Sequence, residues 1–140
     1  MKYAVNLAVD YTRVEKAAFT DKMGTLEAMY AAIGCEMIEI VRVDGLPEGY
    51  VLVVDEEGRC KEHPTLNPLA SYLYHTDRHN SPIVGNAVIM KEVMTPEGAE
   101  LAFLTEDEAK EMESFMLKLW RKAVQTMLAW YNGLERPVGK

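Results

Sequence analysis

The sequence predicts an α+β fold: a mostly antiparallel sheet of 5–6 strands, two short helices and one long C-terminal helix over about 106–132. Two patterns lead to this prediction. Short apolar runs separated by Gly- and Pro-containing turns are typical of antiparallel strands, and the end of the chain has helical periodicity. A chain of 140 residues is expected to form a single domain, with 1–104 as the α+β core and 105–132 as the helix packed across it.

The predicted strands cover residues 3–9, 12–18, 37–43, 50–54, 83–93 and 99–104. Apolar and polar residues alternate from Tyr3 to Val9, as expected for a strand with one buried face. The run Tyr50 to Val54 is apolar without alternation. Such a run indicates a central strand that is covered on both faces of the sheet.

Two of these strands are less regular. The run at 12–18 would form a hairpin with the first strand across Asp10 and Tyr11, but Glu15 to Ala18 suits a helix equally well. Gly85 interrupts the run at 83–93, and a glycine inside a strand indicates a bulge or a close approach of another backbone.

The two short helices are predicted over 26–33 and 68–74. Thr25 is the expected N-cap of the first, and Gly34 supplies the left-handed residue that ends it. Asn67 is a favoured N-cap for the second helix, and Pro68 fits the first helical position, where no N–H is needed. The residues that follow, 75–82, are expected to form a polar loop.

Thr105 and Glu108 have the spacing of a capping box at the start of the long helix, and Gly133 is its expected end. The apolar residues of this helix cover about half of its circumference, which is wider than the stripe that one core requires. Either the core face is unusually broad, or the extra face contacts a second copy of the chain. The residues expected in such a homo-oligomer interface are Met116, Leu117, Trp120, Val124, Met127, Leu128 and Tyr131.

Composition excludes several classes of protein. The net charge of −7 makes a nucleic-acid partner unlikely on electrostatic grounds. No apolar run is long enough to span a bilayer, and the start of the sequence does not resemble a signal peptide. Two cysteines are too few for a disulfide framework and suit a reducing compartment. We therefore expect a cytoplasmic location without membrane partners. The nucleotide-hydrolase, dinucleotide, zincin and esterase motifs are all missing, so no catalytic residues and no cofactor are predicted.

The best candidate for a ligand site is the polar segment 75–81 with the two tyrosines that precede it. Arginine, aromatic and amide side chains together can hold a phosphate and stack on a base. A solvated surface loop is the simpler interpretation of the same residues. The candidate ligand-binding residues are Tyr72, Tyr74, His75, Arg78, His79 and Asn80.

A second spacing resembles a zinc motif, with the possible ligands Cys60, His63, His75 and His79. The pattern is imperfect, because a histidine stands where the second cysteine belongs and a predicted helix intervenes. Three isolated surface histidines explain it equally well. Cys35 as a nucleophile and the acidic turn at 55–58 as a metal site are weaker alternatives again.

Several short motifs occur in a familiar order: Ile33-Gly34, Ile38 to Val41, Val53 to Gly58, Asn67 to Ala70, Ile83 to Asn86 and Leu101 to Thr105. In this order they resemble a family catalogued as domain of unknown function 3846, over about residues 1–113. The chain departs from the family pattern at 102–105, in the enlarged segment 75–82 and in the long apolar helix. The resemblance implies a short α+β domain carried by phages and conjugative elements, and it supplies no catalytic residues.

Three functions follow as hypotheses. The first is a non-enzymatic counter-defence protein that sequesters a small nucleotide-type immune signal, such as a cyclic nucleotide or an ADP-ribose derivative, as a homo-oligomer. The alternative is an acidic protein-interaction module that inhibits or regulates a host or element protein. The third is a small enzyme without a local signature.

Overall fold

The computed structural model describes residues 1–9, 14–61 and 64–134. Its elements are β1 (Lys2–Leu7), β2 (Val14–Phe19), α1 (Thr25–Ile33), β3 (Ile38–Val41), β4 (Tyr50–Asp55), the 3₁₀ helix η2 (Gly58–Cys60), α2 (Pro68–Leu73), α3 (Thr76–His79), β5 (Ala87–Thr95), β6 (Gly98–Ala102) and α4 (Glu106–Leu134). This is the predicted α+β class, with a six-stranded sheet, short helices and one long C-terminal helix.

All strand pairs are antiparallel, and the strand order is β2-β1-β5-β4-β3, with β6 also paired to β5. The first part of β5 lies between β1 and β4, where Ile89 pairs with both Val5 and Leu52. Its last five residues, 91–95, pair with β6 on the side that β1 occupies earlier in the strand, and Lys91 still pairs with Tyr50 of β4. The pairing of Leu7 with Val14 confirms the second strand and excludes the helical alternative for Glu15 to Ala18. The predicted hairpin turn at Asp10 and Tyr11 lies outside the described residues.

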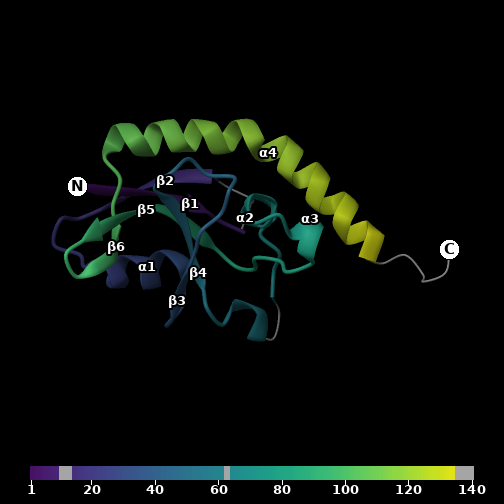
Figure 1. Cartoon of the computed structure of the whole chain (residues 1–140), viewed down its shortest axis with the longest axis horizontal. Helices are drawn as coiled ribbons and strands as arrows, with labels where there is room; N and C mark the ends of the chain where they lie inside the picture. Colours follow the sequence, from purple (N-terminus) through teal and green to yellow (C-terminus); the bar gives the residue numbers. More distant parts are fainter. Residues whose placement is uncertain (10–13, 62–63, 135–140) are drawn as a thin grey trace.

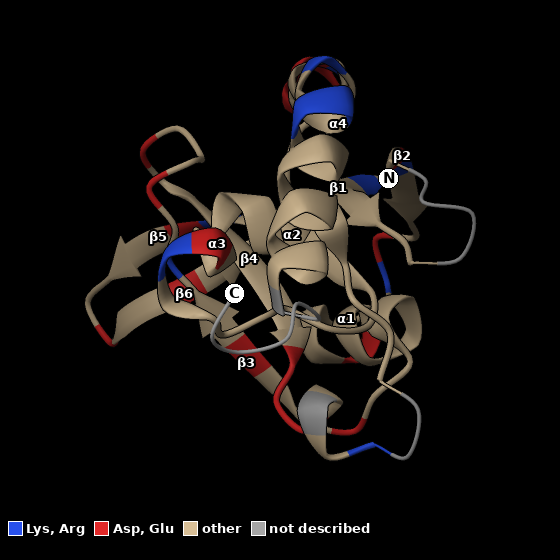
Figure 2. Ribbon diagram, turned by 90° about the vertical axis from the view of Figure 1, so that its right-hand side faces the viewer, with Lys and Arg blue, Asp and Glu red and all other residues tan. Residues whose placement is uncertain are grey.

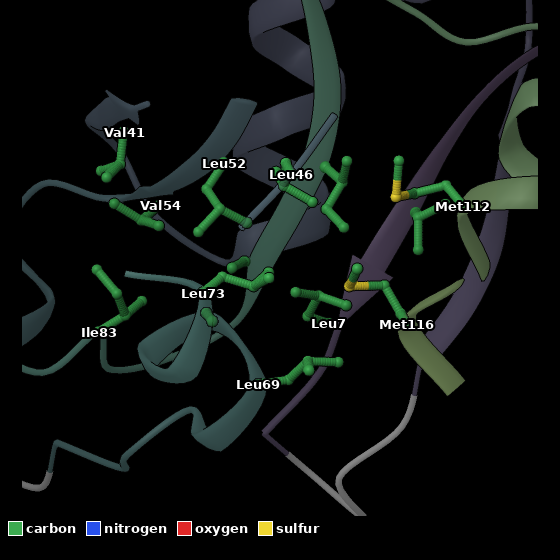
Figure 3. Packing of buried hydrophobic residues seen from close by; sticks show 14 of the residues in the cluster. Leu7, Val41, Leu46, Leu52, Val54, Leu69, Leu73, Ile83, Met112 and Met116 are labelled. Carbon is green, nitrogen blue, oxygen red and sulfur yellow. The ribbon is translucent and has the colours of Figure 1, made fainter. Parts of the chain in front are cut away.

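The sheet is covered on both faces. Helix α1 packs on one face, and α2 and α4 pack on the other (Figures 1 and 2). The residues of β4 from Val51 to Val54 are at most 4% exposed, which confirms the prediction of a strand covered on both sides. On the α2–α4 face, Leu7 and Leu69 lie close to Met112 and Met116 of α4 (Figure 3). Burial of these apolar side chains is the main force that holds α4 to the sheet.

The caps of α1 differ in part from the prediction. The N-cap is Gly24, whose carbonyl accepts a hydrogen bond from the Ala28 N–H at 2.9 Å, so Thr25 is already the first helical residue. Gly34 ends the helix as predicted. It has a φ of 78°, and its N–H donates to the Tyr30 carbonyl at 2.9 Å. A side chain at Gly34 would disfavour this left-handed conformation.

Asn67 is the N-cap of α2, as predicted, and its role is larger than a cap. Its Oδ1 accepts from the Ala70 N–H at 3.1 Å, while its Nδ2 donates to the carbonyls of Leu7 and Gly85, each at 2.9 Å. Both polar atoms of this side chain therefore have hydrogen-bond partners, as expected for a residue that is only 2% exposed. It ties the start of α2 to the end of β1 and to the segment that precedes β5.

The segment 75–82 is not the loop that was predicted, because it contains the short helix α3. Two residues in the left-handed conformation bound this helix, His75 with φ 59° and Asn80 with φ 64°. The Thr76 hydroxyl donates to the Ser81 carbonyl at 2.8 Å and closes the turn.

The following strand begins at Ala87, later than predicted. Ile83 is held instead by the Ser71 hydroxyl, which accepts from its N–H at 2.9 Å and donates to its carbonyl at 3.1 Å. Gly85, with φ 78°, lies before the strand rather than inside it.

Helix α4 begins with the predicted capping box. The Thr105 N–H donates to Glu108 Oε1 at 2.9 Å, and the Glu108 N–H donates to Thr105 Oγ1 at 3.1 Å. Gly133 does not end the helix, which continues to Leu134. The first part of α4 lies along β1 and β2, and the later part passes over α2 and α3 (Figure 1). No helix in the described part of the chain is long and apolar enough to cross a membrane.

The residues expected in an oligomer interface divide into three groups by their exposure. Met116 and Met127 are 0% and 1% exposed within a single chain, so their assignment to an interface was wrong and they belong to the core. Trp120 and Val124 are half-buried. The remaining three stay on the surface: Leu117 is 56%, Leu128 55% and Tyr131 48% exposed. The buried stripe of α4 is therefore narrower than its apolar composition indicates.

Candidate ligand-binding site

A cavity of about 400 Å³ lies between the α2–α3 segment and α4, where the segment that follows β3 also reaches it. Its polar lining comes from both sides: His75 at the N-cap of α3 with Asp77 and Arg78 of that helix, and Lys122 and Thr126 of α4. The remaining walls include Tyr72, Phe115 and Leu119. A cavity of this size falls within the usual range for small-molecule sites.

The turn at His75 positions the α3 side of this cavity. The His75 N–H donates to the Tyr72 carbonyl at 3.1 Å, and the His75 carbonyl accepts from the Arg78 N–H at 2.9 Å. The left-handed conformation of His75 reverses the direction of the chain between α2 and α3. Three of the six candidate ligand residues, Tyr72, His75 and Arg78, therefore line one cavity.

Gly45 lets the segment after β3 approach the end of α2. A Cβ atom on Gly45 would lie 2.9 Å from Leu73 Cδ2 and 3.3 Å from Leu73 Cα. Leu73 is only 1% exposed, so its side chain has little room to move away. The absence of a side chain at Gly45 is thus required for the observed packing at the edge of the cavity.

Two cations face this cavity without a neutralising partner. Arg78 and Lys122 are both exposed, and neither forms an ion pair with any residue in the described part of the chain. Asp77 also lines the cavity, so its lining carries both signs of charge. The basic band on α4 and the mixed charges of α3 are visible in Figure 2.

The other three predicted ligand residues make contacts within the protein. The ring centroids of Tyr74 and His79 lie 4.7 Å apart in an edge-to-face arrangement. His79 Nε2 is 2.6 Å from the Tyr74 carbonyl oxygen, and Nδ1 accepts from the Ser81 N–H at 3.2 Å. Because a carbonyl oxygen only accepts, Nε2 carries the proton. These hydrogen bonds orient α3 and place His79 in a structural role.

Asn80 links α3 to α4. Its Oδ1 accepts a hydrogen bond of 2.7 Å from the Trp130 indole N–H. Trp130, Phe115, Lys122 and Thr126 were not predicted as parts of the site. Phe115, Lys122 and Thr126 share one helix face, so their common direction is visible in the sequence. That α3 packs beside this face depends on the tertiary structure alone.

The zinc alternative is not supported. Of its four residues, His63 lies outside the described residues. Cys60, His75 and His79 do not come together, since the described residues contain no group of three or more His, Cys, Asp or Glu side chains that could hold a metal ion. The acidic turn at 55–58 gives no such group either.

A second cavity, of about 440 Å³, brings together both cysteines and the ion pair between Asp55 and Lys61. The Lys61 ammonium lies 2.8 Å from the Asp55 carboxylate. Burial, followed by the negative charge of Asp55, raises the pKa of the Cys35 thiol. A thiol with a raised pKa is a poor nucleophile at neutral pH, which argues against the catalytic interpretation of Cys35.

The fold and the cavity define a small α+β domain in which an antiparallel sheet supports a ligand-sized cavity under a long C-terminal helix. The chain belongs to the family described as Domain of unknown function (DUF3846), whose sequence pattern matches residues 5–116. This confirms the resemblance seen in the sequence. No curated protein and no solved structure matches the chain. The family match ends inside α4, so Lys122 and Thr126 of the cavity lie beyond it.

Proposed function

We propose that this protein binds a small phosphate-bearing ligand of the nucleotide type in the cavity between α3 and α4, without transforming it. The observation that supports this most directly is the pair of cations, Arg78 and Lys122, which face one cavity without carboxylate partners in the described part of the chain. An anion is the ligand that such a pair would attract.

The rest of the lining matches the other parts of a nucleotide. The Arg78 guanidinium can donate two parallel hydrogen bonds to a phosphate, and the Lys122 ammonium adds a second positive charge. Tyr72 and Phe115 offer aromatic faces for a base, and Phe115 is 37% exposed. The Asp77 carboxylate can accept hydrogen bonds from a ribose hydroxyl or an exocyclic amine. Each of these groups binds or orients a ligand.

In its biological form, the proposal is that the protein sequesters a cyclic nucleotide or ADP-ribose-type immune signal as a homo-oligomer, and so acts as a cytoplasmic counter-defence protein of a phage or mobile element. Sequestration requires tight binding and no chemical step, which suits a site composed of charged and aromatic binding groups. It requires no cofactor.

A second candidate function, an acidic protein-interaction module, rests on a different surface. The hairpin of β5 and β6 exposes the apolar side chains of Val93 and Met94, which are 41% and 80% exposed. Glu97 and Glu100 are exposed on the same hairpin. An apolar pair bordered by carboxylates suits a protein partner with a basic rim.

Thermal unfolding against a panel of cyclic nucleotides and ADP-ribose derivatives tests the first function. A ligand at 100 times its dissociation constant adds about 2.7 kcal/mol of stability, which raises the midpoint by several degrees for a chain of this size. Arg78→Ala and Lys122→Ala should abolish the shift, while the ligand recovered from the wild-type protein should be chemically intact.

Arg121→Ala is the matched control, because Arg121 is an exposed cation next to Lys122 that does not line the cavity. It should leave the ligand-induced shift unchanged. If Arg121→Ala removes the shift as completely as Lys122→Ala, attraction by the general charge of α4 explains the binding and the assigned site is wrong. If no ligand of the panel shifts the midpoint, and a protein co-purifies in a manner that depends on Met94, the second function is favoured.

A further inference from the structure

Helix α4 carries a second hollow surface, of about 660 Å³, beside the proposed ligand cavity. Six residues of α4 line it: Lys110, Glu111, Ser114, Phe115, Lys118 and Leu119. Glu111, Ser114 and Lys118 are turned away from the buried Met116, so this surface lies on the solvent side of the helix. Phe115 and Leu119 line both hollows, so the two sites adjoin each other on α4.

The six lining residues are centred on the point midway between Ser114 and Phe115. Reversing the direction of the helix about this point exchanges Glu111 with Lys118, which lie within about 20° of each other along the middle of this face. Two copies of α4 that pack antiparallel across a two-fold axis at this point would therefore bring Glu111 of one copy opposite Lys118 of the other. A surface that contacts itself in this way is the requirement for an isologous dimer.

The charges on this surface are complementary under the same reversal. Glu111 of one copy would face Lys118 of the other, and the two-fold axis makes this contact twice. Within one chain, neither Glu111 nor Lys118 forms an ion pair with any other described residue. The two side chains are seven residues apart on one helix, about 10 Å along its axis, too far to pair with each other.

The apolar residues fit the same arrangement. Phe115, which is 37% exposed in one chain, lies next to the two-fold axis and on the same side of the contact in both copies, so it would pack against Phe115 of the second copy. The contact would thus have two aromatic rings at the axis and one ion pair on each side of them along the helices.

We infer that this surface, centred on Ser114 and Phe115, is a homodimer interface in which two α4 helices pack antiparallel and Glu111 of each copy pairs with Lys118 of the other. This interface differs from the expected one, because it is centred on Ser114 and Phe115 and does not include the C-terminal residues Leu128 and Tyr131.

Analytical ultracentrifugation of the ligand-free protein over a wide concentration range tests the interface. The wild-type protein should form a dimer that weakens with added salt. Glu111→Lys and Lys118→Glu should each raise the dissociation constant about tenfold or more, because each change converts two attractive contacts into two repulsive ones. The double variant Glu111→Lys/Lys118→Glu should restore the wild-type dissociation constant.

Leu128→Ser is the control, because Leu128 is exposed on α4 but lies nine residues, about 13 Å, beyond the last residue of the proposed interface, and it should leave the dimer intact. Circular dichroism and the unfolding midpoint establish that each variant is folded. The inference is wrong if the wild-type protein is monomeric at every concentration, if the double charge reversal does not restore the dimer, or if Leu128→Ser dissociates it. Because no ligand is present, these results are independent of whether the nucleotide proposal holds.

Discussion

Replacing Asn67 with alanine should destabilise this protein more than any loss of a single surface contact. The alanine variant loses the cap hydrogen bond to the Ala70 N–H and both hydrogen bonds to the carbonyls of Leu7 and Gly85. Loss of an N-cap costs about 1 kcal/mol. Each buried carbonyl left without a donor costs about 1–2 kcal/mol. The expected decrease in the free energy of unfolding is therefore about 3–5 kcal/mol, a large fraction of the 5–15 kcal/mol typical of a domain.

Equilibrium unfolding in urea measures this decrease, with the m-value as a check that the transition remains two-state. Asn67→Ser separates the contributions, because serine is also a favoured N-cap but is too short to reach both carbonyls. It should cost about 1 kcal/mol less than Asn67→Ala. Asn132→Ala, at an exposed position of α4, is the neutral control. A cost below about 1 kcal/mol for Asn67→Ala would refute the argument that this side chain joins α2 to the sheet.

Three further predictions concern packing and charge. Gly45→Ala should cost about 1–3 kcal/mol by overpacking against the end of α2, measured by urea unfolding, and a stabilised variant would contradict the close approach found there. Met116→Ala should cost about 2–5 kcal/mol whereas Leu117→Ala should cost under about 0.5 kcal/mol, and comparable losses would mean that α4 is rotated from its observed orientation. The hydrogen bond from Lys91 lowers the pKa of Glu108, so its contribution to stability is present above the unfolded-state pKa and is lost as the pH falls through the folded-state value. Glu108→Gln keeps a residue that suits the capping box but removes this titration, so the variant should lose less stability on acidification than the wild type. If the unfolding free energies of the variant and the wild type depend on pH in the same way below neutrality, the Lys91–Glu108 pair contributes nothing to stability.

Features that depend on a few neighbouring residues were predictable from the sequence. Asn67 before a proline, and Thr105 three residues before Glu108, are local hydrogen-bonding patterns, and both caps form as expected. The apolar run of β4 likewise indicated burial on both faces of the sheet, because successive side chains of a strand point to opposite faces. These local patterns, taken in order along the chain, also led to the family.

Features that depend on which elements meet were predicted poorly. The segment 75–82 contains only polar turn residues, and nothing in its composition indicated that His75 and Asn80 would adopt left-handed conformations and bound a short helix. Tyr74 and Asn80 were reasonable ligand residues in the sequence, but the structure uses them to hold His79 and Trp130. Such contacts join residues up to 50 positions apart, and no short pattern records them.

The sequence by itself determined the fold class, the order of the elements, most helix caps and the absence of the common catalytic motifs, because each of these follows from local propensity and periodicity. Only the tertiary structure decided which face of α4 is buried, since Met116 and Leu117 are equally apolar and differ only in the direction of their side chains. It also placed Lys122 of α4 beside Arg78 of α3. Side chains from distant elements meet only after the apolar faces have packed, and for that reason the site could be described only from the folded chain.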